Sequence, residues 1–379
     1  MSRVLIIAIA LQMAPRPLSP AATLLAPELL QAIERASVEG KAPTVIAGTD
    51  ASAGEIVLAC AKDCEPVEWA INKLAASGIP RPSRSIRMVK ADQAAPRTAK
   101  AAIFVAAADG LLMRVVRGPW STAGVADEVV EVFARHATDE LTVGAYENVG
   151  QPKWDAAGIP TTAIVPPRNA GGLDRSSFIA AATAYFLATL PNPGAEALLS
   201  HLTVGAHARL AEDGRRAIAQ MGAQQRAGGD VLVLLGQAIE REQRRMRNVE
   251  RFMPEPIDPM LRSRLADMEK GITSVWTSMG ITSSAFVPAA ERLRGRSGED
   301  RRVPARATTA ATTAVDLPAV LARHPNAAAV ADELNNFIDG KRSVSDIRDA
   351  VAAEFGSVPL PAVVEYFESL EKARVISLR

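Results

Sequence analysis

The fold class is decided by the stretch Glu55-Ile56-Val57-Leu58-Ala59-Cys60. Its β-branched and aliphatic residues are typical of a strand. Pro66 follows where it favours the start of a helix, and Gly78 stands where that helix is expected to end. A strand that leads directly into a helix is the repeating unit of α/β proteins.

The same alternation continues on both sides of this stretch. We expect further strands at 43–48, 85–89, 102–107 and 161–165, and further helices at 24–37, 123–136 and 175–190. The run at 102–107 is continuously apolar, as in a strand that is buried on both faces. Because strands alternate with helices, the sequence predicts an α/β core with a mostly parallel sheet.

The character of the sequence changes near residue 194, where long helical patterns replace the alternation. We therefore divide the chain into an N-terminal segment at 1–22, an α/β domain at 23–192, a helical region at 193–292, a linker at 293–316 and a small module at 317–379. The linker is predicted because this segment is rich in Arg, Gly, Ser, Thr and Ala.

Residues 1–22 have two interpretations. Arg3 precedes an apolar run from Val4 to Leu11, and small residues follow near Ala21. This order is typical of a signal peptide, whereas the aliphatic run by itself also fits a buried strand. Localisation therefore stays open between the cytoplasm and export. The run is too short to cross a bilayer in the mature protein, so we predict no integral membrane span.

The charge balance argues against nucleic acid as a partner. Lys and Arg together number 43 and Asp and Glu together number 42, which gives a formal net charge of +1. Such a chain has no overall field that attracts nucleic acid or an anionic membrane. The segment Asp230–Arg251 is rich in charges of both signs, which predicts a solvated helix with ion pairs between successive turns.

The C-terminal residues 317–379 predict three helices and a terminal strand. Ser343 and Asp346 have the spacing of a capping box at the start of the second helix, and Gly356 is placed to end it. The strand is expected at Val375–Leu378. This order of elements is that of a winged-helix-like module.

The third helix of this module, Pro361–Ala373, has the wrong charge for reading nucleic acid. It contains Glu365, Glu368 and Glu371, and its one basic residue is Lys372. A recognition helix needs positive charge to approach phosphates. We therefore expect this module to contact protein.

Common catalytic motifs are missing from the sequence, which contains no HExxH, GxSxG, Walker or GxGxxG pattern. Of the four histidines, His201 and His207 are six residues apart, which does not place them together on one helix face as zinc ligands. Cys60 and Cys64 form a CxxxC pattern with no second cluster, a weak metal signal. We predict two buried or half-buried thiols, with a reactive thiol activated by Lys62 as the alternative.

Several segments nevertheless resemble the M28 family of zinc aminopeptidases. Residues 55–63 resemble the family's strand that leads into His-x-Asp, and 81–89 resemble its "RPxRSIRF" strand. Residues 154–160, which read Trp-Asp-Ala-Ala-Gly-Ile-Pro, resemble the "FWxAGIP" segment that follows the last zinc histidine. Residues 338–343 and 370–373 resemble the winged-helix-like extension of one branch of the family. The resemblance implies a three-layer sheet domain of the aminopeptidase, phosphorylase/hydrolase-like type.

The resemblance also implies that the zinc ligands are lost. The first zinc histidine of the family's motif falls on Ala61, and the aspartate that orients it falls on Asp63. The catalytic glutamate and its zinc-binding neighbour fall near Asp92 and Gln93, and the last zinc histidine falls near Gln151. The glycine-rich stretch with the metal-bridging aspartate is missing after Asp63. A further family aspartate corresponds, in loose register, to Asp109. Asp63, Asp92 and Asp109 are therefore the candidates for a vestigial cleft.

The resemblance thus implies a protein of this family that no longer catalyses hydrolysis. Alanine offers no ligand, and a glutamine carbonyl replaces imidazole poorly. We predict no cofactor and a role in peptide binding or protein assembly, with a homo-oligomer as one form of assembly. Two alternatives stay open. One is an active zinc-dependent aminopeptidase whose atypical ligands are Asp63, Asp92, Asp109 and a distant histidine; the other is a winged-helix regulatory protein.

Overall fold

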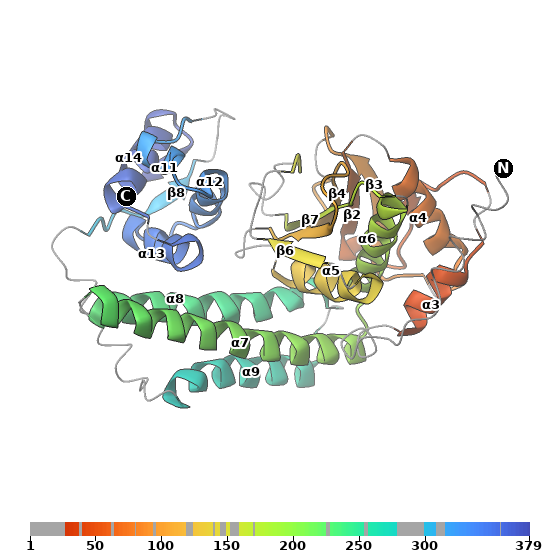
Figure 1. The fold of residues 1–379 in the computed structure, drawn as a ribbon, viewed down its shortest axis with the longest axis horizontal. Coiled ribbons are helices and arrows are strands. Elements are labelled where there is room, and N and C mark those ends of the chain that lie inside the picture. The colour runs from red at the N-terminus through yellow and green to blue at the C-terminus, as the bar shows by residue number, and fades with distance from the viewer. Residues whose placement is uncertain are drawn as a thin grey trace.

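The computed structural model describes residues 27–37, 40–61, 64–79, 81–93, 96–118, 124–138, 141–144, 149–151, 159–169, 171–224, 228–253, 257–278, 299–307, 315–356 and 358–379. An α/β domain and a C-terminal module both lie on the same side of a row of long helices (Figure 1). The predicted N-terminal segment at 1–22 lies outside the described residues. Within these ranges, no helix has both the length and the apolar character needed to cross a membrane.

The centre of the α/β domain is a seven-stranded sheet with the order β1-β3-β2-β4-β7-β5-β6. The strands are β1 Val45–Ile46, β2 Glu55–Cys60, β3 Ser85–Lys90, β4 Ala99–Val105, β5 Met113–Val116, β6 Leu141–Gly144 and β7 Thr161–Val165. The neighbours β3, β2, β4 and β7 run parallel, whereas β1 and β5 each pair antiparallel with this group. β6 runs parallel to β5. The predicted α/β core with a mostly parallel sheet is confirmed.

Two strands were not predicted. β5 and β6 have only four residues each, and each contains a polar residue, Arg114 or Thr142, so neither forms a long apolar run. Short runs of this kind are hard to distinguish from loops by pattern alone. Both strands extend the sheet beyond β7 in the reverse direction, and this reversal matters for the charged network described below.

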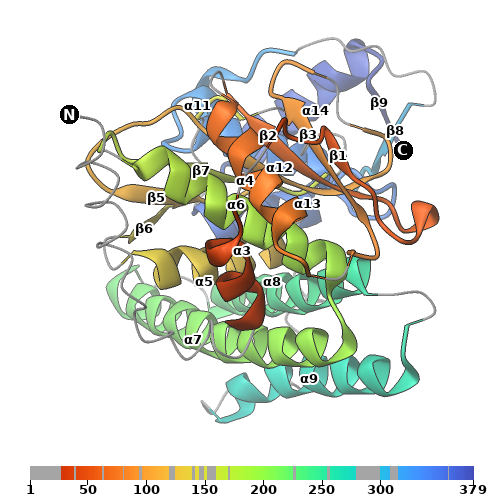
Figure 2. The ribbon, with the colours of Figure 1, turned by 90° about the vertical axis from the view of Figure 1, so that its right-hand side faces the viewer.

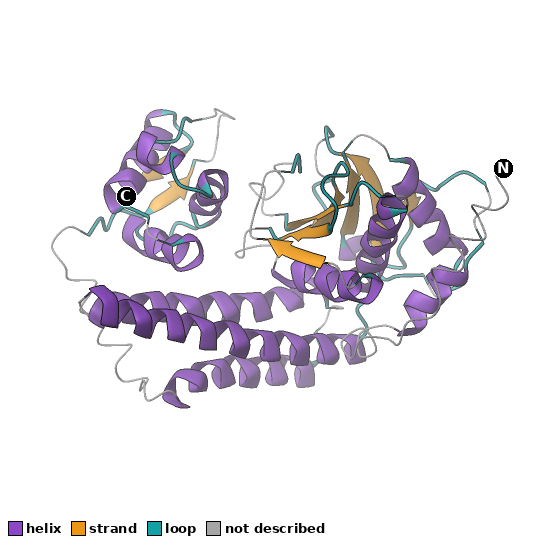
Figure 3. Ribbon diagram, in the orientation of Figure 1, coloured by secondary structure: helices purple, strands orange, loops and turns teal. Residues whose placement is uncertain are grey.

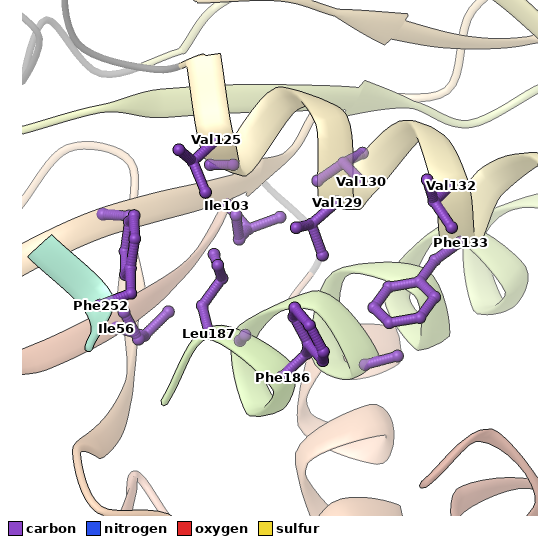
Figure 4. Packing of buried hydrophobic residues seen from close by; sticks show 14 of the residues in the cluster. Ile56, Ile103, Val125, Val129, Val130, Val132, Phe133, Phe186, Leu187 and Phe252 are labelled. Atoms are coloured by element: carbon purple, nitrogen blue, oxygen red, sulfur yellow. The ribbon is translucent and has the colours of Figure 1, made fainter. Parts of the chain in front are cut away.

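Four helices lie beside the sheet: α3 Pro27–Arg35, α4 Glu65–Ala76, α5 Gly124–Ala137 and α6 Gly172–Thr189. α6 packs on β2, β3 and β4, α5 packs on β5, β6 and β7, and α4 packs on α6. Figure 4 shows Ile56 and Ile103 of the sheet facing Val129 of α5 and Leu187 of α6. Each fully buried aliphatic side chain of this kind stabilises the fold by about 1.5–3 kcal/mol.

The other face of the sheet has a smaller apolar cluster. Val57, Ala59, Phe104 and Ala163 belong to it, and its described members all come from strands or from the residues that adjoin them. In the described part of the chain, the layers therefore run from sheet to helices to a second layer of helices, as Figure 3 shows. This order gives three layers, although the sheet is not the middle one.

The second helical layer, which we call the platform, consists of α7 Asn192–Gln224, α8 Gly228–Arg247 and α9 Pro259–Ser278. α7 packs against both α8 and α9 (Figures 1 and 2). The short 3-10 helix η3, Asn248–Phe252, follows α8 and brings Phe252 into the main core. The prediction of long helices after residue 194 is confirmed.

Arg84 fastens the platform to the sheet domain. Its side chain is 3% exposed. Its Nη1 and Nη2 donate to the carbonyls of Phe252 and Met253, both at 2.7 Å, and its Nε donates to the carbonyl of Ala53 at 3.1 Å. Ala53 ends the 3-10 helix η1, Ala51–Ala53. One guanidinium therefore joins three chain segments, and this gives part of the "RPxRSIRF"-like stretch a structural role.

The C-terminal module contains α11 Ala319–Ala322, α12 Ala327–Asn336, α13 Val344–Phe355, α14 Leu360–Lys372 and β9 Ile376–Leu378. The capping box of Ser343 and Asp346 is confirmed, with both reciprocal hydrogen bonds present. Gly356 follows α13 with φ of 90°, a left-handed conformation that favours glycine. The sequence of this module therefore correctly predicted the order of its helices and the residues that cap α13.

Part of the predicted linker at 293–316 is structured. Pro304–Arg306 form strand β8, which pairs antiparallel with β9 at the end of the chain. The linker prediction failed here because the strand has three residues and its partner lies at the other end of the module. Residues 308–314, and those before 299, lie outside the described residues.

Candidate functional site

The carboxyl ends of four parallel strands define the first region of interest. Cys60 pairs with both Lys90 and Val105, and Val105 pairs with Ile164, so β2, β3, β4 and β7 end at one edge of the sheet. We call this the carboxyl edge. Ligand sites of open α/β sheets usually lie outside this edge.

The first group of predicted site residues lies at the carboxyl edge without forming a ligand set. Ala61 follows β2 directly, and its backbone nitrogen donates to the carbonyl of Val105 at 3.1 Å. Asp92 and Gln93 lie in the turn after β3, and both are exposed. The Gln93 Oε1 accepts a hydrogen bond from the backbone nitrogen of Lys90 at 3.0 Å. Asp63 lies outside the described residues, as do 154–158 of the Trp154–Pro160 segment.

Asp109 is held by arginines at the same edge. It follows β4, its side chain is 56% exposed, and its carboxylate contacts Arg168 at 3.0 Å and Arg114 at 3.3 Å. The backbone nitrogen of Asp109 donates to the carbonyl of Pro166 at 2.9 Å, which fixes the loop beside β7. Two guanidiniums therefore occupy the surroundings of this carboxylate, where a metal site would place further ligands.

Gln151 has a local role. Its Oε1 accepts from the backbone nitrogen of Val149 at 2.7 Å, and Val149 packs against the smaller apolar cluster of the sheet, which contains Val57 and Phe104. Within the described ranges, no three His, Cys, Asp or Glu side chains come close enough together to hold a metal ion. The structure thus brings Ala61, Asp92, Gln93 and Asp109 to one edge of the sheet, but it does not unite them in a metal-binding constellation.

A pocket of about 280 Å³ adjoins Asp109 at this edge. The loops after β4 and β7 and the first turn of α6 line it, and its polar side chains are Arg168, Asn169 and Asp174. Beside it, Leu111 is 86% exposed in the loop between β4 and β5. The pocket has mixed charge and no described metal ligand set.

The prediction of two free thiols is wrong. Cys60 and Cys64 form a disulfide with a Cα–Cα separation of 5.5 Å, and the alternative of a reactive thiol fails with it. Cys60 ends β2 and Cys64 precedes the first residue of α4. The turn from strand to helix brings the two Cα atoms within the usual range for a disulfide, and a CxxxC spacing alone does not reveal this. The bond closes the loop that contains Ala61.

A second region lies at the opposite edge of the sheet and was not predicted. Because β5 runs antiparallel to β7, Gly118 after β5 lies near the start of β7. Asp127 of α5 connects the two, since its Oδ1 accepts from the Gly118 nitrogen at 3.2 Å and from the Thr162 hydroxyl at 2.6 Å. We call this the amino edge, because it is where the parallel strands begin.

A network of buried charges extends from the amino edge into the platform. Arg241, Glu242 and Arg245 of α8 are 8%, 0% and 5% exposed. The prediction of a solvated helix over Asp230–Arg251 is therefore wrong for these residues. A signal was present in the sequence, because Glu242 stands at helical spacing in the stripe formed by Leu235, Ala238, Met246 and Val249, all of which are buried.

Glu128 is the centre of this buried ion-pair network. Its carboxylate contacts Arg209 of α7 at 2.6 Å, Arg245 of α8 at 2.8 Å and the Nε2 of His201 at 3.5 Å. Glu242 contacts Arg209 at 2.8 Å and Arg241 at 2.9 Å. Carboxylates and guanidiniums from α5, α7 and α8 thus compensate one another, which buried charges require.

The adjacent residues Asp127 and Glu128 have pKa values that are shifted in opposite directions. Burial raises the pKa of Asp127 to about 6, although the Thr162 hydrogen bond and nearby guanidiniums oppose the shift. Burial acts to raise the pKa of Glu128 as well, but His201, Arg245 and Arg209 outweigh it and hold that pKa well below its usual range. The difference arises because Glu128 contacts His201, Arg245 and Arg209 directly, whereas Asp127 contacts none of them.

The C-terminal module docks on this side of the platform. α13 packs on α8. Arg342, just before α13, contacts Glu240 of α8 at 2.8 Å. The Phe337 ring contacts two guanidiniums, that of Arg342 at 4.8 Å and that of Arg244 at 5.3 Å from its centroid. Cation–π contacts and a half-buried ion pair therefore fix the module to the platform.

A pocket of about 260 Å³, which we call the junction pocket, opens where the three parts of the chain meet. Its five arginines are Arg117, Arg209, Arg216, Arg241 and Arg245. Its three carboxylates are Glu212, Asp213 and Glu354, the last of which belongs to α13 of the C-terminal module. Five distant segments contribute to it, so a sequence motif could not have indicated it.

Comparison with known proteins adds no family assignment to this structural description. No protein-family model matches the sequence, and no curated protein matches it.

Proposed function

We propose that this chain is a non-catalytic relative of the zinc aminopeptidases that binds peptides or takes part in protein assembly. The observation that carries the proposal is the state of the carboxyl edge, where Asp109 is paired with Arg114 and Arg168. The resemblance, in addition, aligns Ala61 with the first zinc histidine of the family. A two-zinc site requires several anionic or imidazole ligands around each ion. A carboxylate between two guanidiniums already has its charge balanced.

The segments that resemble the aminopeptidases have structural roles that do not depend on a metal. Arg87 of β3 forms a bidentate ion pair with Glu55 of β2, at 2.6 and 2.8 Å. Arg84 joins the sheet domain to the platform. These contacts support a scaffold that persists after its catalytic residues are gone, because folding alone would preserve them.

The C-terminal module supports a role in protein contact. We assign it to the winged-helix-like type from its three main helices and the β8–β9 pair. Its α14 exposes Glu365 and Glu371, whereas Glu368 pairs with Arg302 at 3.0 Å. An acidic helix face of this kind repels nucleic acid and favours a protein partner.

The decisive experiment measures metal content and peptidase activity on the same full-length sample. After expression in zinc-supplemented medium, we expect less than one zinc per ten chains and no release of amino acids from a panel of aminoacyl substrates. The binding arm uses equilibrium dialysis with short peptides that have free amino termini, and we expect saturable binding without cleavage.

An active peptidase would give the opposite pattern. Stoichiometric zinc, together with cleavage that a chelator abolishes and that Asp109→Asn weakens, would overturn the proposal and favour the atypical-ligand alternative. Glu196→Gln is a matched control, because the exposed ion pair of Glu196 with Arg264 joins two platform helices, α7 and α9. Absence of both binding and cleavage would remove peptide binding and leave protein assembly to be tested by the oligomeric state.

A further inference from the structure

The junction pocket has features of a binding site that the proposed function does not use. It lies at the amino edge, away from Asp109 and the carboxyl edge. Its lining contains more guanidiniums than carboxylates, five against three. The guanidiniums come from the end of β5, from α7 and from α8, so they surround the pocket from several directions.

Two of these arginines have donors that no described residue satisfies. The Nε atoms of Arg117 and Arg245 are buried and have no hydrogen-bond partner among the described residues. One Nη of each is held elsewhere, since Arg117 contacts Glu131 at 2.5 Å and Arg245 contacts Glu128 at 2.8 Å. The Arg245 Nε lies 3.9 Å from Glu242, beyond hydrogen-bond distance. Buried donors are nearly always paired with protein or with another molecule, so these two call for an acceptor.

We infer that the junction pocket binds a small phosphate-bearing molecule. A phosphate group carries up to two negative charges and three acceptor oxygens, which suits guanidiniums that converge from different elements. The carboxylates behind the pocket hold these guanidiniums in position, so less ordering is needed when the ligand arrives. A volume of about 260 Å³ accommodates a phosphate group together with part of the molecule that bears it.

Glu354 makes the site sensitive to the C-terminal module. Its carboxylate lies in the same pocket and acts electrostatically on Arg245. A phosphate group and Glu354 therefore compete for the same positive charge. Removing the charge of Glu354 should strengthen phosphate binding, whereas removing a lining arginine should weaken it.

The test titrates inorganic phosphate into the full-length chain, with heat of binding and thermal unfolding as readouts and with ionic strength matched by chloride. Arg216→Ala removes a lining arginine whose side chain is 61% exposed, so folding should be preserved. Arg264→Ala is the control, because Arg264 of α9 is 46% exposed and neither it nor its ion-pair partner Glu196 lines the pocket. Both variants lose one positive charge.

We expect saturable binding near one phosphate per chain, an affinity about tenfold weaker in Arg216→Ala, and no change in Arg264→Ala. Glu354→Gln should bind several-fold more tightly. Equal weakening in the two arginine variants, or a response that chloride reproduces, would show that only general charge is involved and would overturn the inference. A complete lack of saturable binding would overturn it as well. None of these results bears on the peptidase question, because that site lies at the other edge.

Discussion

The two edges of the sheet differ in how their charges are placed. At the carboxyl edge, Asp109 and Arg168 are largely exposed and lie in neighbouring loops, whereas Arg114 of β5 is 28% exposed. At the amino edge, Glu128 and Glu242 are buried and contact arginines on two platform helices. Exposed ion pairs contribute little to stability, whereas a buried charge that loses its partner is very costly. The edge where function was expected is therefore energetically the weaker one.

Glu242→Ala should produce the largest effect. It would leave the half-buried guanidinium of Arg209 and the buried guanidiniums of Arg241 and Arg245 without a shared carboxylate, at a cost of about 3–5 kcal/mol in the free energy of unfolding. Asp109→Ala at the carboxyl edge should cost about 0–1 kcal/mol. Urea unfolding of both variants measures the contrast, and similar losses would remove the proposed distinction between the edges.

The pH dependence of stability tests how Asp127 is buried. Its pKa is raised from 3.8 to about 6 in the folded protein, so the folded state holds the proton more firmly than the unfolded state. Its stabilising contribution is thus complete below about pH 4 and is lost as the pH rises through about 6, a change of about 3 kcal/mol.

The measurement compares wild type with Asp127→Asn, which does not titrate. The stability of the wild type relative to the variant should fall between pH 4 and pH 7. Glu128 and other carboxyl groups titrate in both proteins, so their contributions cancel. A difference that stays constant over this range would mean that the Asp127 carboxyl is not buried as described.

Gly124 tests how closely α5 packs on the network. A Cβ at this position would lie 2.7 Å from the Cγ of Arg245, so Gly124→Ala should displace that side chain and cost about 1–3 kcal/mol. Gly236→Ala in α8 is the control, because a Cβ there meets nothing within 4 Å. The control should stabilise the helix by about 0.5–1 kcal/mol. Thermal unfolding should show shifts of opposite sign, and equal shifts would contradict the described packing.

The disulfide offers a test at the carboxyl edge. Cys60→Ser with Cys64→Ser removes the constraint on a very short loop and should cost about 2 kcal/mol by chain entropy. A reducing agent should destabilise the wild type by a similar amount and leave the double variant unchanged. If the reducing agent has no effect on the wild type and mass measurement finds two thiols, the bond is absent in solution.

The sequence predicted what depends on local pattern. The stretch Glu55–Cys60 is a strand, α4 follows it, and the capping box of Ser343 and Asp346 begins α13 as expected. β5 and β6 were missed because four-residue strands derive their stability from their neighbours.

The site predictions depended on contacts that the sequence does not encode locally. Asp92 and Asp109 reach the same edge because parallel strands end together, which topology allowed us to expect. The pairing of Asp109 with Arg168 and the meeting of Glu128 with Arg209 join segments 59 and 81 residues apart. No periodicity or motif marks such pairs. Ion pairs between residues this far apart in the sequence can be identified only from the folded structure.

The Arg84 contacts bear on where this chain could be divided. The sequence pattern changes from alternating strands and helices to long helices near residue 194. Arg84 nevertheless donates to the carbonyls of Phe252 and Met253, which lie well beyond that point. A fragment that ended at residue 192 would keep the buried guanidinium and lose two of its acceptors. We therefore expect the sheet and the platform to unfold together, and the Arg84 contacts can form only after Met253 has been synthesised.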